Sequence, residues 1–281
     1  MELKIFEVDI LWHALEITGL VFIMMIVIDW IDVRTRGRIP VWISHHRIYQ
    51  YFLASFFGLI PACMGSYLNV SLYMHGYLSI GAIVGGMIST TGEASLVMFA
   101  EFPKTAVIIH LILLTGGILF AFLTDSIVNR FKIRHKLECH SLVYHRDETS
   151  LLHYLKYHIW EHLFKKHIWR IFLWTFFAIW FTHVGTHYYD LGTFIKSHPQ
   201  VILLFAVLIG LIPDIAPQFV FVFMFSEGLI PFSVLLTSSM VQNGHGMLPL
   251  LSYSLRDSII IKIFNVFFGA LTGIIFMSMG W

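Results

Sequence analysis

The stretch "GLIPDIAPQF", residues 210–219, places two prolines and a carboxylate inside an otherwise apolar run. A second stretch, "FGLIPACMGS" at residues 57–66, contains the same Gly-Leu-Ile-Pro sequence 152 residues earlier. The same shift, without a gap, also aligns glycines and basic residues: Gly76 with Gly228, Gly92 with Gly244, Lys104 with Arg256, and Gly117 with Gly269. Matches in one register predict an internal repeat.

The composition indicates a membrane protein. The 281 residues are 57% hydrophobic and 12% charged, whereas soluble domains carry about 25% charged residues. Apolar runs fall at about 9–31, 47–60, 62–74, 77–100 and 105–125, and again at about 168–188, 199–212, 215–226, 229–251 and 258–280. We therefore predict an all-α polytopic membrane protein with about ten membrane elements and lipid as a partner, without nucleic acid.

Charge decides the predicted topology. The segments 34–47 and 130–170 are strongly basic, so both are expected to be cytoplasmic. The chain must then cross the membrane an even number of times between them, and the short runs 47–60 and 62–74 must together return to the side they came from. This gives two inverted five-element repeats with discontinuous helices. The predicted divisions are a first membrane repeat (1–129), a His-rich basic cytoplasmic linker (130–167) and a second repeat (168–281), with the N-terminus outside.

The predicted helix breaks carry the candidate site. Proline leaves backbone carbonyls unpaired, and in hydrocarbon that is tolerated only where the backbone lines an enclosed or watery cavity. The breaks are Pro61, Gly92, Pro213, Pro217 and Gly244. Intramembrane ionisable and polar residues at such breaks predict a transport site near the midplane. The candidate residues are Glu93, Asp214, Gln218, Asn243, His245, Gln242, Thr91 and Cys63. The alternative is a pair of proline kinks whose polar residues hydrogen-bond between helices.

Further ionisable residues form candidate secondary metal or pathway sites. His13 and Glu16 lie one turn apart in the first run, and Asp29 and Asp32 follow near its cytoplasmic end. A third group, with helical spacing at the outer end of the sixth run, consists of His183, His187 and Asp190. An interfacial position is the alternative for each group. Whether the linker histidines bind metal stays open.

The two repeat stretches resemble the manganese or heavy-metal exporter family, which is also labelled arsenic efflux. The resemblance rests on "GLIPACMGSYLNVSLYMHGYLSIGAIVGGMISTTGEA" and "GLIPDIAPQFVFVFMFSEGLIPFSVLLTSSMVQNGHGMLPLL" and covers most of the chain. It implies a ten-element efflux permease without an ATPase domain. Gln218, Gln242 and Gly244 agree with the family pattern, whereas Asp214 and His245 depart from it, so the metal stays open.

These observations predict a secondary-active transporter rather than an enzyme. The sequence contains no nucleotide-binding loop, no His-Glu-x-x-His pair and no Gly-x-Ser-x-Gly elbow. Carboxylate, amide and imidazole ligands suit Mn²⁺ or Fe²⁺, with the metal as substrate and no cofactor. We expect export by alternating access in a bacterial inner membrane, with proton exchange as a hypothesis. The alternatives are an arsenite-type efflux permease using Cys63, a membrane scaffold, or an intramembrane metalloenzyme. The direction of transport and the oligomeric state are not fixed by the sequence.

Overall fold

The computed structural model describes residues 46–61, 64–74, 76–132, 197–212, 216–247, 250–251 and 254–281, with isolated positions 11, 12, 15, 19, 172, 173, 176, 177 and 180. The described residues form helices and turns and contain no strand. In chain order the helices are α3 (Arg47–Gly58), α4 (Met64–Met74), α5 (Ile80–Ile88), α6 (Ala94–Glu101), α7 (Pro103–Phe131), α11 (Pro199–Ile209), α12 (Ala216–Ser226), α13 (Phe232–Val241), the 3₁₀ turn η2 (Gly244–Gly246) and α15 (Leu255–Ser278). The described part of the chain is therefore all-helical, as predicted.

The helix starts follow the offset of 152 residues. Helices α11, α12, α13 and α15 begin 152 residues after α3, α4, α5 and α7, respectively. We call the helices α3 to α7 the first half and the helices α11 to α15, with η2, the second half. Local sequence explains several of these starts. Ser79 Oγ accepts a 3.1 Å hydrogen bond from the Ala82 amide before α5, and Ser254 Oγ accepts one of 3.2 Å from the Asp257 amide before α15. Pro103 occupies the first turn of α7, where its missing N–H costs no hydrogen bond.

Glycine closes the corresponding turns in both halves. Gly76 follows α4 with φ of 74°, and Gly228 follows α12 with φ of 64°, a conformation that residues with a Cβ atom rarely adopt. The amide of the next residue in each case returns to the helix, from Tyr77 to Leu72 at 2.9 Å and from Leu229 to Met224 at 2.8 Å. These are the hydrogen bonds of a glycine-terminated helix end.

Helices α7 and α15 have the length and composition of membrane-spanning helices. They contain 29 and 24 residues, with hydropathies of 2.5 and 2.2 over their most apolar windows. At about 1.5 Å per residue, both exceed the roughly 30 Å of a bilayer's hydrocarbon core. Much of their surface is apolar and exposed: Leu111 is 57% exposed and Ile274 is 59% exposed. Such surface suits contact with lipid.

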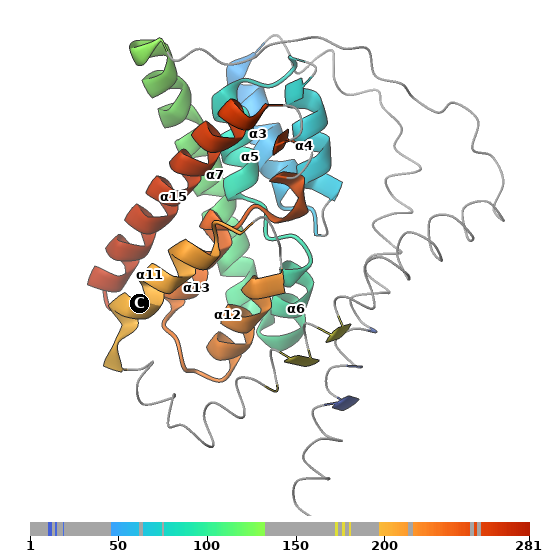
Figure 1. Cartoon of the computed structure of the whole chain (residues 1–281), viewed down its shortest axis with the longest axis vertical. Coiled ribbons are helices and arrows are strands. Elements are labelled where there is room, and N and C mark those ends of the chain that lie inside the picture. The colour runs from blue at the N-terminus through green and yellow to red at the C-terminus, as the bar shows by residue number, and fades with distance from the viewer. Residues whose placement is uncertain are drawn as a thin grey trace, which may run out of the picture.

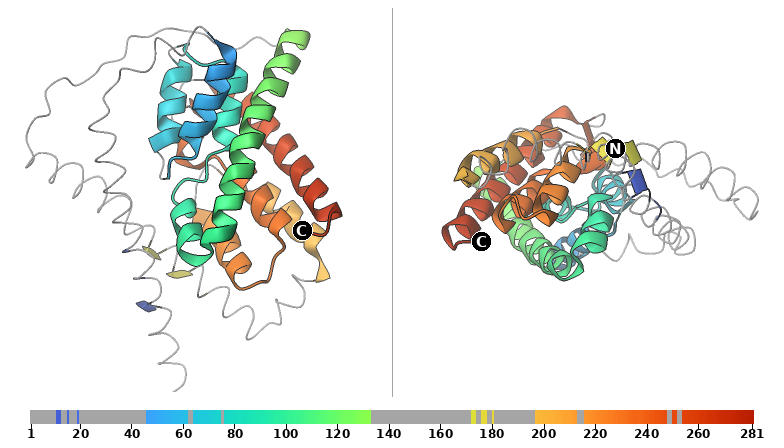
Figure 2. Two further views of the ribbon diagram at one scale, coloured as in Figure 1. Left: turned by 180° about the vertical axis from the view of Figure 1, so that it is seen from behind. Right: turned by 90° about the horizontal axis from the view of Figure 1, so that it is seen from below.

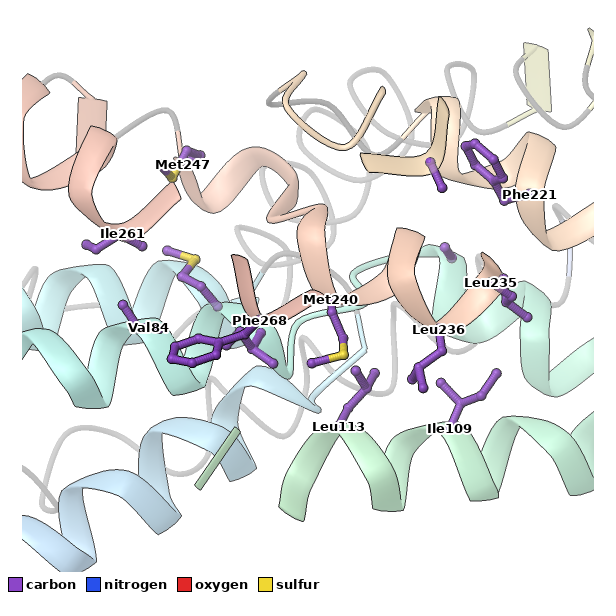
Figure 3. Close-up of a cluster of buried hydrophobic side chains, with 14 of the residues drawn as sticks. Val84, Ile109, Leu113, Phe221, Leu235, Leu236, Met240, Met247, Ile261 and Phe268 are labelled. Atoms are coloured by element: carbon purple, nitrogen blue, oxygen red, sulfur yellow. The ribbon is translucent and has the colours of Figure 1, made fainter. Parts of the chain in front are cut away.

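Two buried helices, α5 and α13, lie at the centre of the packing. Helix α5 packs against α3 and α7, and α13 packs against α11 and α15. Every residue of α5 is buried, as are residues 233–241 of α13. Figure 3 shows the apolar cluster to which α5, α7, α12, α13 and α15 contribute side chains. The two buried helices therefore form the centre of the two halves.

The two halves also contact each other. Helix α12 of the second half contacts α6 of the first, and α4 of the first half contacts η2 of the second. Figure 1 shows α3, α4 and α5 gathered toward one end of the molecule and α6, α11 and α12 toward the other. In the view from behind, the long helix α7 runs past both groups (Figure 2). The segments between α5 and α6 and after α13 thus lie where the halves meet.

Candidate functional site

Two breaks between helices hold the described part of the candidate site. The first separates α5 from α6 and contains Thr91, Gly92 and Glu93; the second follows α13 and contains Gln242, Asn243 and Gly244. Both glycines have φ of 56°. All the polar side chains of this group, together with Gln218 of α12, are at most 4% exposed. The chain therefore places buried polar groups where helical hydrogen bonding stops.

In the first break, Thr91 pairs with His110 of α7. Thr91 Oγ1 lies 3.2 Å from His110 Nε2, and His110 Nδ1 lies 2.7 Å from the carbonyl oxygen of Ala106. A carbonyl only accepts, so Nδ1 carries a hydrogen, and in the neutral ring Nε2 accepts from the Thr91 hydroxyl. The imidazole also stacks at a tilt on Phe99, with 4.8 Å between ring centroids. These contacts fix the orientation of the ring.

In the second break, Asn243 pairs with Lys262 of α15. Lys262 Nζ donates to Asn243 Oδ1 at 2.8 Å, to the carbonyl oxygen of Gly210 at 2.7 Å and to that of Val241 at 2.9 Å. The amide nitrogen Nδ2 of Asn243 lies 3.3 Å from the carbonyl oxygen of Met87 at the end of α5. Asn243 therefore links the second break to the buried helix of the first half.

These two pairs occupy equivalent positions. Asn243 lies 152 residues after Thr91, and Lys262 lies 152 residues after His110. In each half a residue of the break is hydrogen-bonded to a nitrogen-bearing side chain of the long apolar helix. The chemistry differs, since an imidazole stands in one half and an ammonium in the other.

Glu93 and Gln218 complete the described site residues. Glu93 is the N-cap residue of α6 and is 4% exposed, so a carboxylate stands beside a helix N-terminus inside the protein. Gln218 Nε2 donates to Ser239 Oγ at 3.2 Å and connects α12 to α13. Gln218 Oε1 is buried and accepts no hydrogen bond from the described residues. An amide oxygen of this kind suits a hard or borderline cation.

The other predicted site residues are not placed. Cys63, Pro213 and Asp214, and the side chain of His245, lie outside the described residues. The same holds for the candidate pathway residues His13, Glu16, Asp29, Asp32, His183, His187 and Asp190. Pro61 lies in the bend after α3, and Pro217 lies in the first turn of α12. Within the described ranges, no three His, Cys, Asp or Glu side chains are grouped to hold a metal ion.

Sequence reasoning missed several buried polar groups. Lys262 lies inside the last apolar run, and its ammonium binds three oxygens within the protein. The Asn265 amide, one turn further along α15, is fully buried. A single polar residue inside a long apolar run was the available signal, because such residues are costly in a membrane.

The chain matches a known protein family over most of its length. The model of the family described as "Putative, 10TM heavy-metal exporter" matches the chain in two segments, residues 13–179 and 166–279. Searches of curated proteins and of solved structures return no match. The match confirms the predicted relationship and covers nearly the whole chain. The chain thus belongs to this family of ten-span heavy-metal exporters, which makes it an integral membrane protein.

Proposed function

We propose that this protein is a secondary-active exporter of a divalent transition metal, Mn²⁺ or Fe²⁺, and that it works by alternating access. The proposal is carried by the paired breaks at Gly92 and Gly244, which put buried polar groups at equivalent positions of two similar halves. Transporters built from repeats bind their substrates at such breaks.

The proposed topology is two inverted five-element repeats with discontinuous helices. The shared offset of the helix starts supports two equivalent halves. Helix α12 contacts α6, and α4 contacts η2. Such reciprocal contacts between the two halves are expected if a two-fold axis relates one half to the other. In Figure 1, α15 ends beside the C-terminus, whereas α7 ends at the opposite end of the molecule, which supports opposite directions for the two long helices. We place the protein in a bacterial inner membrane, with the N-terminus outside and residues 130–167 in the cytoplasm.

The proposed substrate ligands are drawn from both breaks and from the segment before α12. Glu93 supplies a buried carboxylate and Gln218 a buried amide oxygen in the described part. The remaining proposed ligands are Asp214, Gln242, Asn243, His245 and Thr91. Carboxylate, amide and imidazole groups together suit Mn²⁺ and Fe²⁺ better than a thiophilic ion. Metal binding displaces protons from such ligands, which supports proton exchange through Glu93, Asp214 or His245.

Transport into proteoliposomes tests the proposal. Mn²⁺, Fe²⁺, Co²⁺, Zn²⁺ and arsenite are presented in parallel to the wild type, Glu93→Gln and Glu227→Gln. Glu227 is the matched control because it is an exposed carboxylate at the end of α12. We expect Mn²⁺ or Fe²⁺ transport that Glu93→Gln abolishes and Glu227→Gln retains.

Two other outcomes of the transport assay would change the proposed substrate or the proposed ligands. Arsenite transport that depends on Cys63 would replace the metal cation with a metalloid. Divalent-metal transport by Glu93→Gln at the wild-type rate would remove Glu93 from the site while leaving the exporter function standing.

A further inference from the structure

The ammonium of Lys262 is bound by a group of protein oxygens that resembles a cation-binding site. Its ammonium contacts three oxygens at 2.7–2.9 Å, and an ammonium has three N–H groups to donate. The oxygens come from the C-cap of α11 (Gly210), the last residue of α13 (Val241) and the second break (Asn243). All the donors of the lysine are therefore used by protein oxygens.

Two of these oxygens stand at helix C-termini. The last carbonyls of a helix lack intrahelical partners and carry the negative end of the helix dipole. Carbonyl oxygens arranged around one point replace the hydration shell of K⁺ in potassium channels. The ends of α11 and α13 thus present the oxygen chemistry that binds a dehydrated monovalent cation.

Close packing brings the three oxygens together. A Cβ at Gly210 would come within 2.8 Å of Val241 Cγ1, and one at Gly269 of α15 would come within 2.5 Å of Val241 Cγ2. Glycine at both positions lets α11 and α15 close on Val241 from two sides. The arrangement is therefore fixed by the packing of three helices.

The aliphatic stem of Lys262 approaches from an apolar groove. The groove has a volume of about 670 Å³, and Leu211, Ile259, Ile263 and Val266 are among the residues that line it. Lys262 is itself among the residues that line this groove, and its ammonium binds the three oxygens, as expected of a long side chain with an apolar stem and a charged end.

The charge of the site favours a monovalent occupant. Helices α5, α11 and α13, which pack against α15, carry no ionisable side chain. On α15 itself, Asp257 accepts a hydrogen bond of 2.8 Å from Tyr73, and Arg256 is exposed. Divalent ions are usually bound through carboxylates, whereas the three oxygens here are neutral. Asp214 and the side chain of His245 lie outside the described residues.

We propose that the oxygens of Gly210, Val241 and Asn243 form a monovalent-cation site whose resident occupant is the ammonium of Lys262. The tethered cation holds the ends of α11 and α13 against α15, as a bound ion would. In the first half the equivalent helix position holds His110, which binds Thr91 and a carbonyl of its own helix. The site is thus a feature of the second half. It shares Asn243 with the proposed substrate ligands, whereas the oxygens of Gly210 and Val241 are not among them.

Chemical rescue of a variant that lacks the Lys262 ammonium tests this site. The full-length Lys262→Ala protein, in detergent, is heated in choline chloride, KCl, NaCl or methylammonium chloride at equal ionic strength. We expect its midpoint of thermal unfolding to fall below that of the wild type in choline. KCl or methylammonium chloride at saturating concentration should then raise it by at least about 3 °C, without raising that of the wild type. The matched control is Lys104→Ala, which removes an exposed lysine at the start of α7.

Two additional variants keep the test decisive. Lys262→Ala combined with Asn243→Ala lacks one oxygen and should lose most of the rescue. Lys262→Gln is measured in the same way if the alanine variant does not fold. A folded variant that no monovalent cation stabilises, or equal stabilisation of Lys104→Ala, would overturn the proposal. Rescue by Mn²⁺ alone would also overturn it, because the oxygens of Gly210 and Val241 would then belong, with Asn243, to the substrate site. The readout is stability, so its outcome is separate from that of the transport assay.

Discussion

The phenol of Tyr73 on α4 donates a 2.8 Å hydrogen bond to Oδ2 of Asp257 on α15, across 184 residues of sequence. Both residues are fully buried, and the bond joins the first half of the chain to the second. A hydrogen bond to a buried charged group contributes more than one between neutral groups. This contact therefore helps to hold α4 of the first half against α15 of the second half.

Removing the Tyr73 hydroxyl should weaken the protein. We expect Tyr73→Phe to lower the free energy of unfolding by about 1–3 kcal/mol, because Asp257 loses a donor inside the protein. Thermal unfolding of the purified protein measures the change. Tyr67→Phe is the control, since Tyr67 lies on the same helix and is 40% exposed. Equal loss in both variants would contradict a specific role for the bond.

Two adjacent glycines of α7 should respond oppositely to alanine. A Cβ at Gly117 would collide with Ser89 Oγ and come within 2.8 Å of the carbonyl oxygen of Gly85, whereas a Cβ at Gly116 meets only the ring of Phe120 at 3.5 Å. We expect Gly117→Ala to destabilise by roughly 1–3 kcal/mol through overpacking. Gly116→Ala should be neutral or stabilise by about 0.5–1 kcal/mol, because alanine is the better helix former. Unfolding curves of the two variants, recorded side by side, decide the matter.

The glycine of the first break should tolerate asparagine better than alanine. Gly92 has φ of 56°, where a Cβ costs about 1–2 kcal/mol and asparagine is the least penalised alternative. We therefore expect Gly92→Ala to lower the unfolding temperature more than Gly92→Asn. The same order is expected at Gly244, which has the same φ. If alanine and asparagine were equivalent at both positions, backbone conformation would not be what selects glycine there.

Asp125 should stabilise the first turn of α5. Its Oδ1 accepts a 2.8 Å hydrogen bond from the Gly81 amide, and its Oδ2 accepts one of 2.8 Å from the Tyr51 hydroxyl. We expect Asp125→Ala to speed hydrogen exchange at the first amides of α5 and to destabilise by about 2 kcal/mol or more. Ser126→Ala, at the next and exposed position, is the control. Unchanged exchange at Gly81 in Asp125→Ala would refute this role.

Thr91 should matter for transport more than for folding. Thr91→Val keeps the size of the side chain but removes the hydroxyl that lies 3.2 Å from His110 Nε2. If Thr91 contacts the substrate, loss of one interaction worth about 1.4–3 kcal/mol lowers transport roughly 10–100-fold. Initial rates in proteoliposomes measure this, and Thr115→Val, an exposed threonine of α7, is the control. Wild-type rates in Thr91→Val would remove Thr91 from the proposed site.

The sequence by itself determined the helical membrane class, the family and the offset of 152 residues. These properties depend on local composition and on residues with special backbone geometry, such as Gly76, Gly92, Gly228 and Gly244, whose positive φ values recur in both halves. The inverted arrangement and the substrate ligands stay predictions, because several of the residues that carry them lie outside the described ranges.

Only the tertiary structure decided which polar residues meet. The sequence showed Lys262 as one charge in an apolar run, and it gave no partner for Tyr73 or His110. Their partners are Asn243, Asp257 and Thr91, which lie 19–184 residues away in the chain. Such pairs form only when packed helices bring both groups out of water together, and glycines such as Gly210 and Gly269 set how closely those helices approach.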